Sequence, residues 1–246
     1  MQIGRVTPSS ITDLWTAVEP FIRDAQRLEP AAQTLVDAVY RRFEESVVLA
    51  RMFVTVPFDS LPPSNRHFAK RQADKAEEAG SLRTVTPVLS LIGTCGQEPS
   101  WNDRRRSNNH IGIPLISSVF VDGIPMISRL LKELGVPLDW VDSQDSTMIE
   151  KTMGRSAGLF FVGDAAQATD QRGRKIIVAQ DFVETYGVKA VFGIGGAYVG
   201  GQIVVLVVFC RGDVPRHAAE SFLSLTALFK NKTAGLIGEG RIFDGF

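Results

Sequence analysis

The sequence of 246 residues is poor in cysteine, with only Cys95 and Cys210, which stand far apart in the chain. Two distant thiols do not make the framework of disulfides that stabilises small secreted domains. The three histidines, at positions 67, 110 and 217, also lack the spacing of metal ligands, either with one another or with a cysteine. We therefore expect a protein of a reducing compartment, without a metal site.

Long apolar runs are missing as well. The longest, IVVLVVFC at 203–210, falls far short of the roughly 20 residues that span a bilayer. The first residues, MQIGRVTPSSITDLW, lack the uninterrupted apolar core of a signal peptide. These two absences predict a cytoplasmic protein that does not bind membranes.

The sequence has no excess of charge of either sign, because 27 Lys and Arg balance 27 Asp and Glu. A net charge of zero, with no sustained basic stripe, argues against nucleic acid as a partner. Catalytic motifs are also missing: we find no phosphate-binding loop, no Ser/His/Asp order and no recognisable pair of acid and base carboxylates. The segment GIGGAYVGG at 193–201 fails as a dinucleotide motif, because its third glycine would fall at Tyr198 and a strand follows it.

Hydrophobic residues make up 44% of the chain and follow clear periodicities. A helix is predicted from residue 11 onward, with Ser10 as its cap, Asp13 completing the capping box and a kink or restart before Pro20. A second helix has Pro30 in its first turn. Two further helices are expected at 121–134 and around 146–154, and a last one covers 218–229.

Strands are indicated by β-branched and aromatic runs at 47–56, 87–96 and 158–164. Two apolar runs within 190–213 flank Gly200-Gly201, which predicts a β-hairpin. The order of elements predicts an α+β fold, with a central antiparallel sheet of about five strands between N- and C-terminal helices. We expect a single domain, divided into N-terminal helices (1–47), a core that contains the sheet (48–232) with a long insertion (96–156), and an irregular tail (233–246).

The segment 188–229, with its glycine turn, second strand and closing helix, resembles the C-terminal half of GAF domains. ARMFVTVPFDSLP (50–62) and TPVLSLIGTCGQEPSWNDRR (86–105) are similar to sensor segments beside PAS and histidine-kinase modules of bacterial signalling proteins. The resemblance implies a GAF/PAS-like sheet with a ligand pocket on one face. It further implies a non-catalytic sensory or regulatory domain that binds a small molecule, forms a homodimer and acts on a signalling partner such as a histidine kinase. The apolar stripes of 11–47 and 216–229 suit such a homodimer.

The richest candidate site lies in the stretch 93–115, GTCGQEPSWNDRRRSNNHIGIPL. Arg104 and Arg105 could bind a carboxylate or phosphate through paired hydrogen bonds, with the indole of Trp101 as a stacking wall. The alternative is a solvated loop, in which the arginines pair with acids such as Asp103. His110 is either a pocket residue, with axial ligation of a haem as one role, or an ordinary hydrogen-bonded side chain.

Three more residues complete the predicted site. The resemblance places Asp181 and Tyr186 opposite the stretch 93–115 as pocket-lining residues; helix capping and packing is the alternative. Cys95 lies at a strand end, where backbone amides could lower the pKa of its thiol. A reactive Cys95 would favour a thiol enzyme similar to the GAF-fold free methionine sulfoxide reductases, with Cys210 as the only other thiol, and otherwise Cys95 is a small buried residue.

A third function class, an interaction or dimerisation scaffold that binds no ligand, also stays open. The sequence does not identify a cofactor or the chemical class of the ligand.

Overall fold

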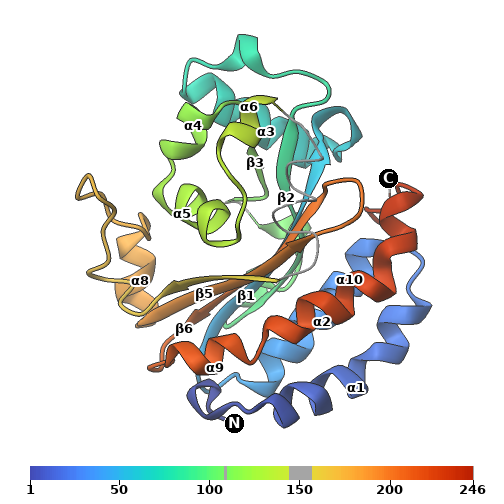
Figure 1. Ribbon diagram of the computed structural model, residues 1–246, viewed down its shortest axis with the longest axis vertical. Coiled ribbons are helices and arrows are strands. Elements are labelled where there is room, and N and C mark those ends of the chain that lie inside the picture. Colours follow the sequence, from blue (N-terminus) through green and yellow to red (C-terminus); the bar gives the residue numbers. More distant parts are fainter. Residues whose placement is uncertain (108–109, 144–156, 246) are drawn as a thin grey trace.

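The computed structural model describes residues 1–107, 110–143 and 157–245. The described residues form a six-stranded antiparallel sheet with the strand order β3-β2-β1-β6-β5-β4 (Figure 1). Its strands are β1 (Val47–Pro57), β2 (Pro87–Gly96), β3 (Gly112–Pro114), β4 (Gly158–Val162), β5 (Ala190–Ala197) and β6 (Ile203–Cys210). The predicted α+β class and antiparallel sheet are confirmed. The additional strand, β3, lies inside the insertion and is too short to produce a periodic pattern.

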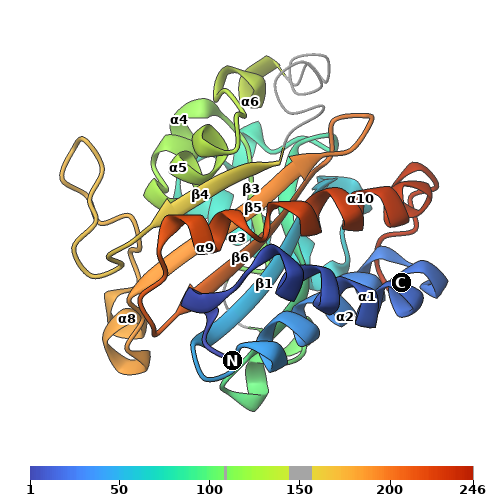
Figure 2. The same cartoon turned by 60° about the horizontal axis from the view of Figure 1, so that its bottom comes forward.

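One face of the sheet carries a layer of long helices (Figures 1 and 2). These are α1 (Pro8–Asp24), α2 (Leu28–Arg42) and α10 (Leu223–Gly238), with the short α9 (Arg216–Glu220) before α10. Their apolar residues form one core cluster with alternate residues of the strands, as the period of two along a strand requires. We call this side of the sheet the helical face.

The opposite face is covered by shorter helices, and we call it the insertion face. These helices are α4 (Ser118–Asp122), α5 (Pro125–Glu133), α6 (Asp139–Ser143) and α8 (Gln180–Tyr186), while α3 (Pro63–Lys75) runs along β3 at the sheet edge. A second core cluster fills the space beneath them. The helix predicted at 146–154 lies outside the described residues.

The N-terminal helix differs from its prediction in two details. It is capped by Thr7, whose Oγ1 accepts a hydrogen bond from Ser10 N at 3.2 Å, so the helix begins at Pro8 and not after Ser10. It also continues through Pro20 without a restart. Val18 and Ile22 on either side of this proline are buried in the core, and their burial holds both halves of the helix in place.

The C-terminal tail is more ordered than predicted. Helix α10 continues to Gly238, and the chain then passes the N-terminus of α2, where Leu28 N and Glu29 N donate to the carbonyl oxygens of Arg241 and Ile242 at 2.9 and 2.8 Å. The backbone N–H groups in the first turn of a helix have no acceptors within the helix. Here the tail supplies the acceptors for two of these N–H groups. The tail is therefore part of the fold.

The apolar stripes predicted to form a homodimer bundle are used inside the chain. Ile11, Leu14, Phe222 and Leu225 are buried against the sheet and neighbouring helices, so they are not available to a second copy. The homodimer stays a prediction, and it would need another surface. No helix among the described residues is long and apolar enough to cross a bilayer.

The hairpin prediction is confirmed. Strands β5 and β6 pair from Ala190↔Cys210 to Ala197↔Ile203, and Gly200 and Gly201 have φ angles of 98° and 85°. The turn is closed by a hydrogen bond from Gly201 N to Tyr198 O at 3.0 Å, and glycine adopts the positive φ angles at positions 200 and 201 without steric cost.

Candidate functional site

The structure divides the predicted site residues into separate groups. Trp101 and Tyr186 come together on the insertion face: their ring centroids are 4.8 Å apart, and Phe182 lies 5.8 Å from Trp101. Phe182 also meets Phe209 edge to face at 5.5 Å. These aromatic rings pack against one another. The contacts favour the alternative in which Tyr186 is an ordinary packing residue and does not line a pocket. Asp181 is exposed in the first turn of α8.

Arg104 and Arg105 turn toward α2 and the C-terminal tail. The Arg104 side chain is 6% exposed and donates from Nη2 to Glu29 Oε2 at 2.6 Å, while Arg105 Nη2 lies 3.7 Å from Glu29 Oε1. Glu29 Oε2 also accepts a hydrogen bond from Asp244 N at 2.8 Å, and the Arg104 guanidinium lies 5.0 Å from the Phe243 ring centroid. We call these five residues the Glu29 clasp. The arginines do pair with an acid inside the protein, but their main partner is distant in the sequence.

Cys95 lies on β2 and faces the helical side, within the first core cluster. Burial raises the pKa of its thiol to about 12, and the neighbouring Asp37 carboxylate adds to the shift. Of the two alternatives for Cys95, these observations favour the small buried residue, because α2 covers this end of the strand and excludes water. Cys210 is also free and fully buried, and burial raises its pKa too.

A buried arginine that the sequence analysis missed lies on the insertion face. Arg51 is in the middle of β1 and pairs with Thr94 of β2 and Val207 of β6. Paired residues of antiparallel strands point to the same face, and Val207 belongs to the second core cluster, so Arg51 and Thr94 face that cluster. The only signal in the sequence is a cation in the otherwise mostly apolar run ARMFVTVP, which contains one other polar residue, Thr55.

Arg51 has polar neighbours, and its side chain is largely shielded from solvent. The residue is 8% exposed, and burial lowers the pKa of its guanidinium to about 10. Its Nη2 donates to Ser107 Oγ at 2.6 Å. Thr94 is fully buried, and its hydroxyl has no hydrogen-bond partner among the described residues.

His110 is the predicted site residue that lies near this arginine. Its backbone has a φ of 55°, which is uncommon outside glycine. Although the residue as a whole is exposed, the protein atoms around its ring lower the pKa, and the charge of Arg51 lowers it further. We call Arg51, Thr94, Ser107 and His110 the Arg51 site. Buried guanidinium and hydroxyl donors of this kind suit a carboxylate or phosphate group.

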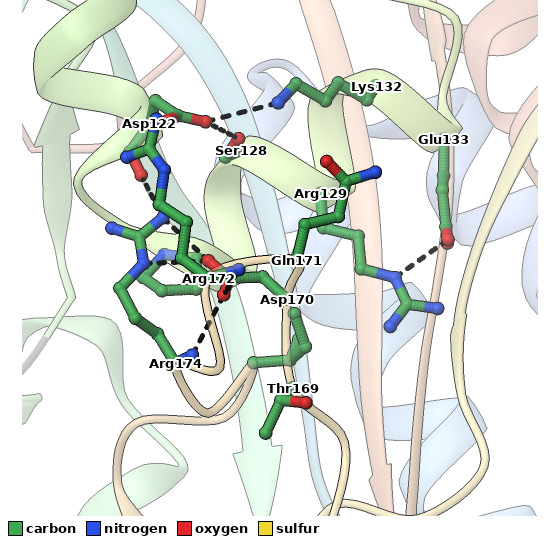
Figure 3. A pocket seen from close by; sticks show the side chains of 12 residues that line it. Asp122, Ser128, Arg129, Lys132, Glu133, Thr169, Asp170, Gln171, Arg172 and Arg174 are labelled. Atoms are coloured by element: carbon green, nitrogen blue, oxygen red, sulfur yellow. Dashed lines mark hydrogen bonds and ion pairs between the residues drawn. The ribbon is translucent and has the colours of Figure 1, made fainter.

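A separate cavity of about 490 Å³ lies beside α5 (Figure 3). Its walls come from α5, the preceding Asp122 and the segment between β4 and α8. The wall contains charged residues of both signs: Asp122, Arg129, Lys132, Glu133, Asp170, Arg172 and Arg174. None of these residues was among the predicted site residues, since each stands in ordinary polar surroundings in the sequence.

Comparison with known proteins shows a likeness of fold. No family model and no curated protein matches the sequence. The phycocyanobilin-bound GAF domain from a cyanobacterial phytochrome aligns with 12% identity over 93% of this chain and 96% of that one, at a TM-score of 0.50. The GAF domain of a phosphoenolpyruvate-protein phosphotransferase from Coxiella burnetii aligns with 10% identity over 96% and 99% of the two chains, at a TM-score of 0.49.

Proposed function

Because the chain has the GAF fold, we propose that it is a non-catalytic sensory domain that binds a small anionic molecule at the Arg51 site. The observation that carries this proposal is the buried guanidinium of Arg51 on a central strand, facing the insertion side of the sheet. The phytochrome domain of the same fold is a ligand-bound domain, which supports the same kind of role here.

The chemistry of the Arg51 site favours a carboxylate or phosphate. An anion that reaches the guanidinium of Arg51 would form charge-assisted hydrogen bonds with it, and a medium of low dielectric constant strengthens such bonds. The hydroxyl of Thr94 supplies a second donor. His110, with its lowered pKa, is neutral near pH 7 and adds one further hydrogen bond without charge.

A route from this site to the surface runs through the loop after β2. Ser107, the partner of Arg51, directly follows the 3-10 turn Arg104–Arg106, and Arg104 belongs to the Glu29 clasp. A ligand that takes over the guanidinium of Arg51 would release Ser107 and shift the loop, and the clasp would pass that shift to Asp244. A signalling partner such as a histidine kinase would read the resulting change in population of two tail conformations.

The test is a ligand screen on the purified chain and on two variants. Carboxylates and phosphates are added one by one while the melting temperature is recorded, and native mass spectrometry detects any molecule that copurifies. We expect at least one anion to raise the melting temperature by a few degrees, which corresponds to roughly 1–3 kcal/mol of binding linkage for a domain of this size. Arg51→Met and Thr94→Val should abolish or reduce that rise.

Thr233→Val is the matched control, because Thr233 is a fully buried threonine in the helical layer, where its hydroxyl bonds Phe229 O and Tyr198. This variant should keep the ligand response of the unmodified chain. The proposal would be contradicted if every responding anion gave the same response in Arg51→Met, with its fold verified by circular dichroism, or if no anion of either class gave a response.

The thiol-enzyme alternative finds no support in the two cysteines, since both are buried and both have raised pKa values. Thiol catalysis needs an accessible thiolate. If turnover of free methionine sulfoxide were found and then lost in Cys95→Ser, the chain would be an enzyme and the non-catalytic proposal would fail.

A further inference from the structure

We propose that the cavity beside α5 is a second binding site, which takes a compact dianion, with carboxylate or phosphate groups, between Lys132 and Arg172. The cavity lies in the size range of small-molecule sites at about 490 Å³. It opens between α5 and the segment around the bridge Thr169↔Lys175, and it shares no residue with the Arg51 site. This inference therefore stands independently of the proposed function.

Two of the four cations in the wall are fixed as structural supports. Arg129 Nε lies 2.8 Å from Glu133 Oε1, and its Nη2 donates to Phe161 O at 2.9 Å. Arg174 donates from Nε to Asp170 Oδ2 at 2.7 Å and from Nη2 to Asp122 O at 2.8 Å. Each guanidinium is held by one carboxylate and one carbonyl oxygen, so both arginines hold α5 and the 164–178 segment in place.

The other two cations, Lys132 and Arg172, share a single carboxylate (Figure 3). Asp122 Oδ1 lies 3.2 Å from Lys132 Nζ, and Asp122 Oδ2 lies 3.0 Å from Arg172 Nη2. Ser128 Oγ also donates to Asp122 Oδ1 at 2.8 Å. The wall thus carries four cations against three carboxylates, and one acid serves two cations.

The carboxylate of Asp122 is itself an oxyanion that Ser128, Lys132 and Arg172 stabilise at the wall of the cavity. The hydrogen bonds from Ser128 and Lys132 keep the pKa of its carboxyl below the usual range. Lys132 and Arg172 are 54% and 69% exposed, so both side chains can turn from Asp122 toward a ligand in the cavity. Arg172 would hold one anionic group through paired hydrogen bonds, and Lys132 would supply a point charge for the other.

The charge of Asp122 sets the selectivity of this site. A monoanion offers one negative charge, which competes with Asp122 for the same two cations. A dianion can bridge Lys132 and Arg172 while Asp122 keeps the hydrogen bond from Ser128. We therefore expect pyrophosphate or citrate, which carry at least two negative charges each near neutral pH, to bind and the monoanion acetate not to bind under the same conditions. Binding should be weaker at high salt because the two cations are exposed.

Isothermal titration calorimetry at low salt, with pyrophosphate, citrate and acetate as separate probes, tests the site. Lys132→Gln and Arg172→Gln should each weaken binding of pyrophosphate or citrate about tenfold or more. Asp122→Asn should tighten it, because this change removes the competing negative charge and retains an acceptor for Ser128. A purely structural role of Asp122 would not produce a gain in affinity.

Matched controls come from exposed ion pairs outside the cavity. Lys189, paired with Asp213, is exposed to 58%, and Arg23, paired with Asp24, is exposed to 56%. Lys189→Gln and Arg23→Gln should leave the affinity unchanged. Titrations in the Arg51→Met background separate this site from the Arg51 site, and the losses caused by Lys132→Gln and Arg172→Gln should persist in that background. The proposal is overturned if neither pyrophosphate nor citrate binds, or if binding survives in both Lys132→Gln and Arg172→Gln. The probe that binds more tightly distinguishes phosphate from carboxylate chemistry.

Discussion

Burial is the main influence on the pKa values of the two cysteine thiols. Cys95 stands among small residues at a strand end, a sequence context that is compatible with an activated thiol. In the fold, α2 covers it and the Asp37 carboxylate lies close by, so the neutral thiol is favoured. Cys210 and Tyr198 are likewise buried, and their pKa values are raised in the same direction.

These raised pKa values predict a loss of stability at alkaline pH. In the unfolded chain the Cys95 thiol ionises near its ordinary pKa of 9.0, whereas in the folded chain it keeps its proton up to about pH 12. The unfolded state therefore binds fewer protons in this range, and the free energy of unfolding falls as the pH rises, by about 1.4 kcal/mol per pH unit for one such group.

Urea unfolding of the intact chain and of Cys95→Ala between pH 8.5 and 10.5 measures this effect. The variant should show a shallower decline with pH, whatever its stability at pH 8.5. Equal slopes for the two proteins would show that Cys95 ionises in the folded state as readily as in the unfolded state.

At the level of elements, glycines allow α5 to approach the sheet closely. A Cβ atom on Gly158 of β4 would lie 2.5 Å from Leu134 Cα, and one on Gly195 of β5 would lie 2.8 Å from a methyl group of Leu134. The backbone after α5 therefore packs directly on these strands. This contact fills the part of the insertion face near β4 and β5, while the Arg51 site lies farther along the sheet on β1 and β2.

The close contact predicts that Gly158→Ala destabilises the fold. Because the backbone of Leu134 cannot move as a flexible side chain would, we expect a loss of about 1–3 kcal/mol in the free energy of unfolding. Gly235→Ala on α10 is the control, because a Cβ there meets nothing within 4 Å. This second change should stabilise the helix by roughly 0.5–1 kcal/mol. Chemical denaturation measures the free energy of unfolding of both variants. A Gly158→Ala variant of unchanged stability would disprove the close packing.

In the whole molecule, the Glu29 clasp connects three distant parts of the chain. Glu29 stands at the start of α2, Arg104 follows β2, and Asp244 belongs to the tail after α10. The Arg104–Glu29 pair joins residues that are 75 positions apart, and the Glu29–Asp244 hydrogen bond joins residues 215 apart.

We predict that Glu29→Gln loosens the loop and the tail together. Removing one partner of a buried ion pair leaves the other charge uncompensated, so the free energy of unfolding should fall by about 3–5 kcal/mol. Glu239→Gln breaks an exposed pair with Arg241 and should cost less than about 1 kcal/mol. Hydrogen exchange should show faster exchange of the amides of Phe243 and Asp244 in Glu29→Gln only. Unaltered exchange at both amides would contradict the role of the clasp.

The local elements could be predicted because their signals are local. The apolar run at 47–56, the strand at 87–96 and the hairpin around Gly200-Gly201 each carry their own alternation or turn residues, and the structure confirms them. The contacts of the tail after Gly238 could not be predicted, since nothing in its sequence reveals the free N–H groups of α2 to which it binds.

The sequence by itself determined the α+β class, the main strands and the absence of a disulfide framework, because composition and periodicity are properties of the chain. Only the tertiary structure decided the partners of the candidate site residues. Arg104 meets Glu29 and Cys95 faces α2, while Arg51 is buried beside Thr94 and Ser107. Which face of the sheet a side chain occupies depends on strand register and on the helices that cover it, and these contacts join residues far apart in the sequence.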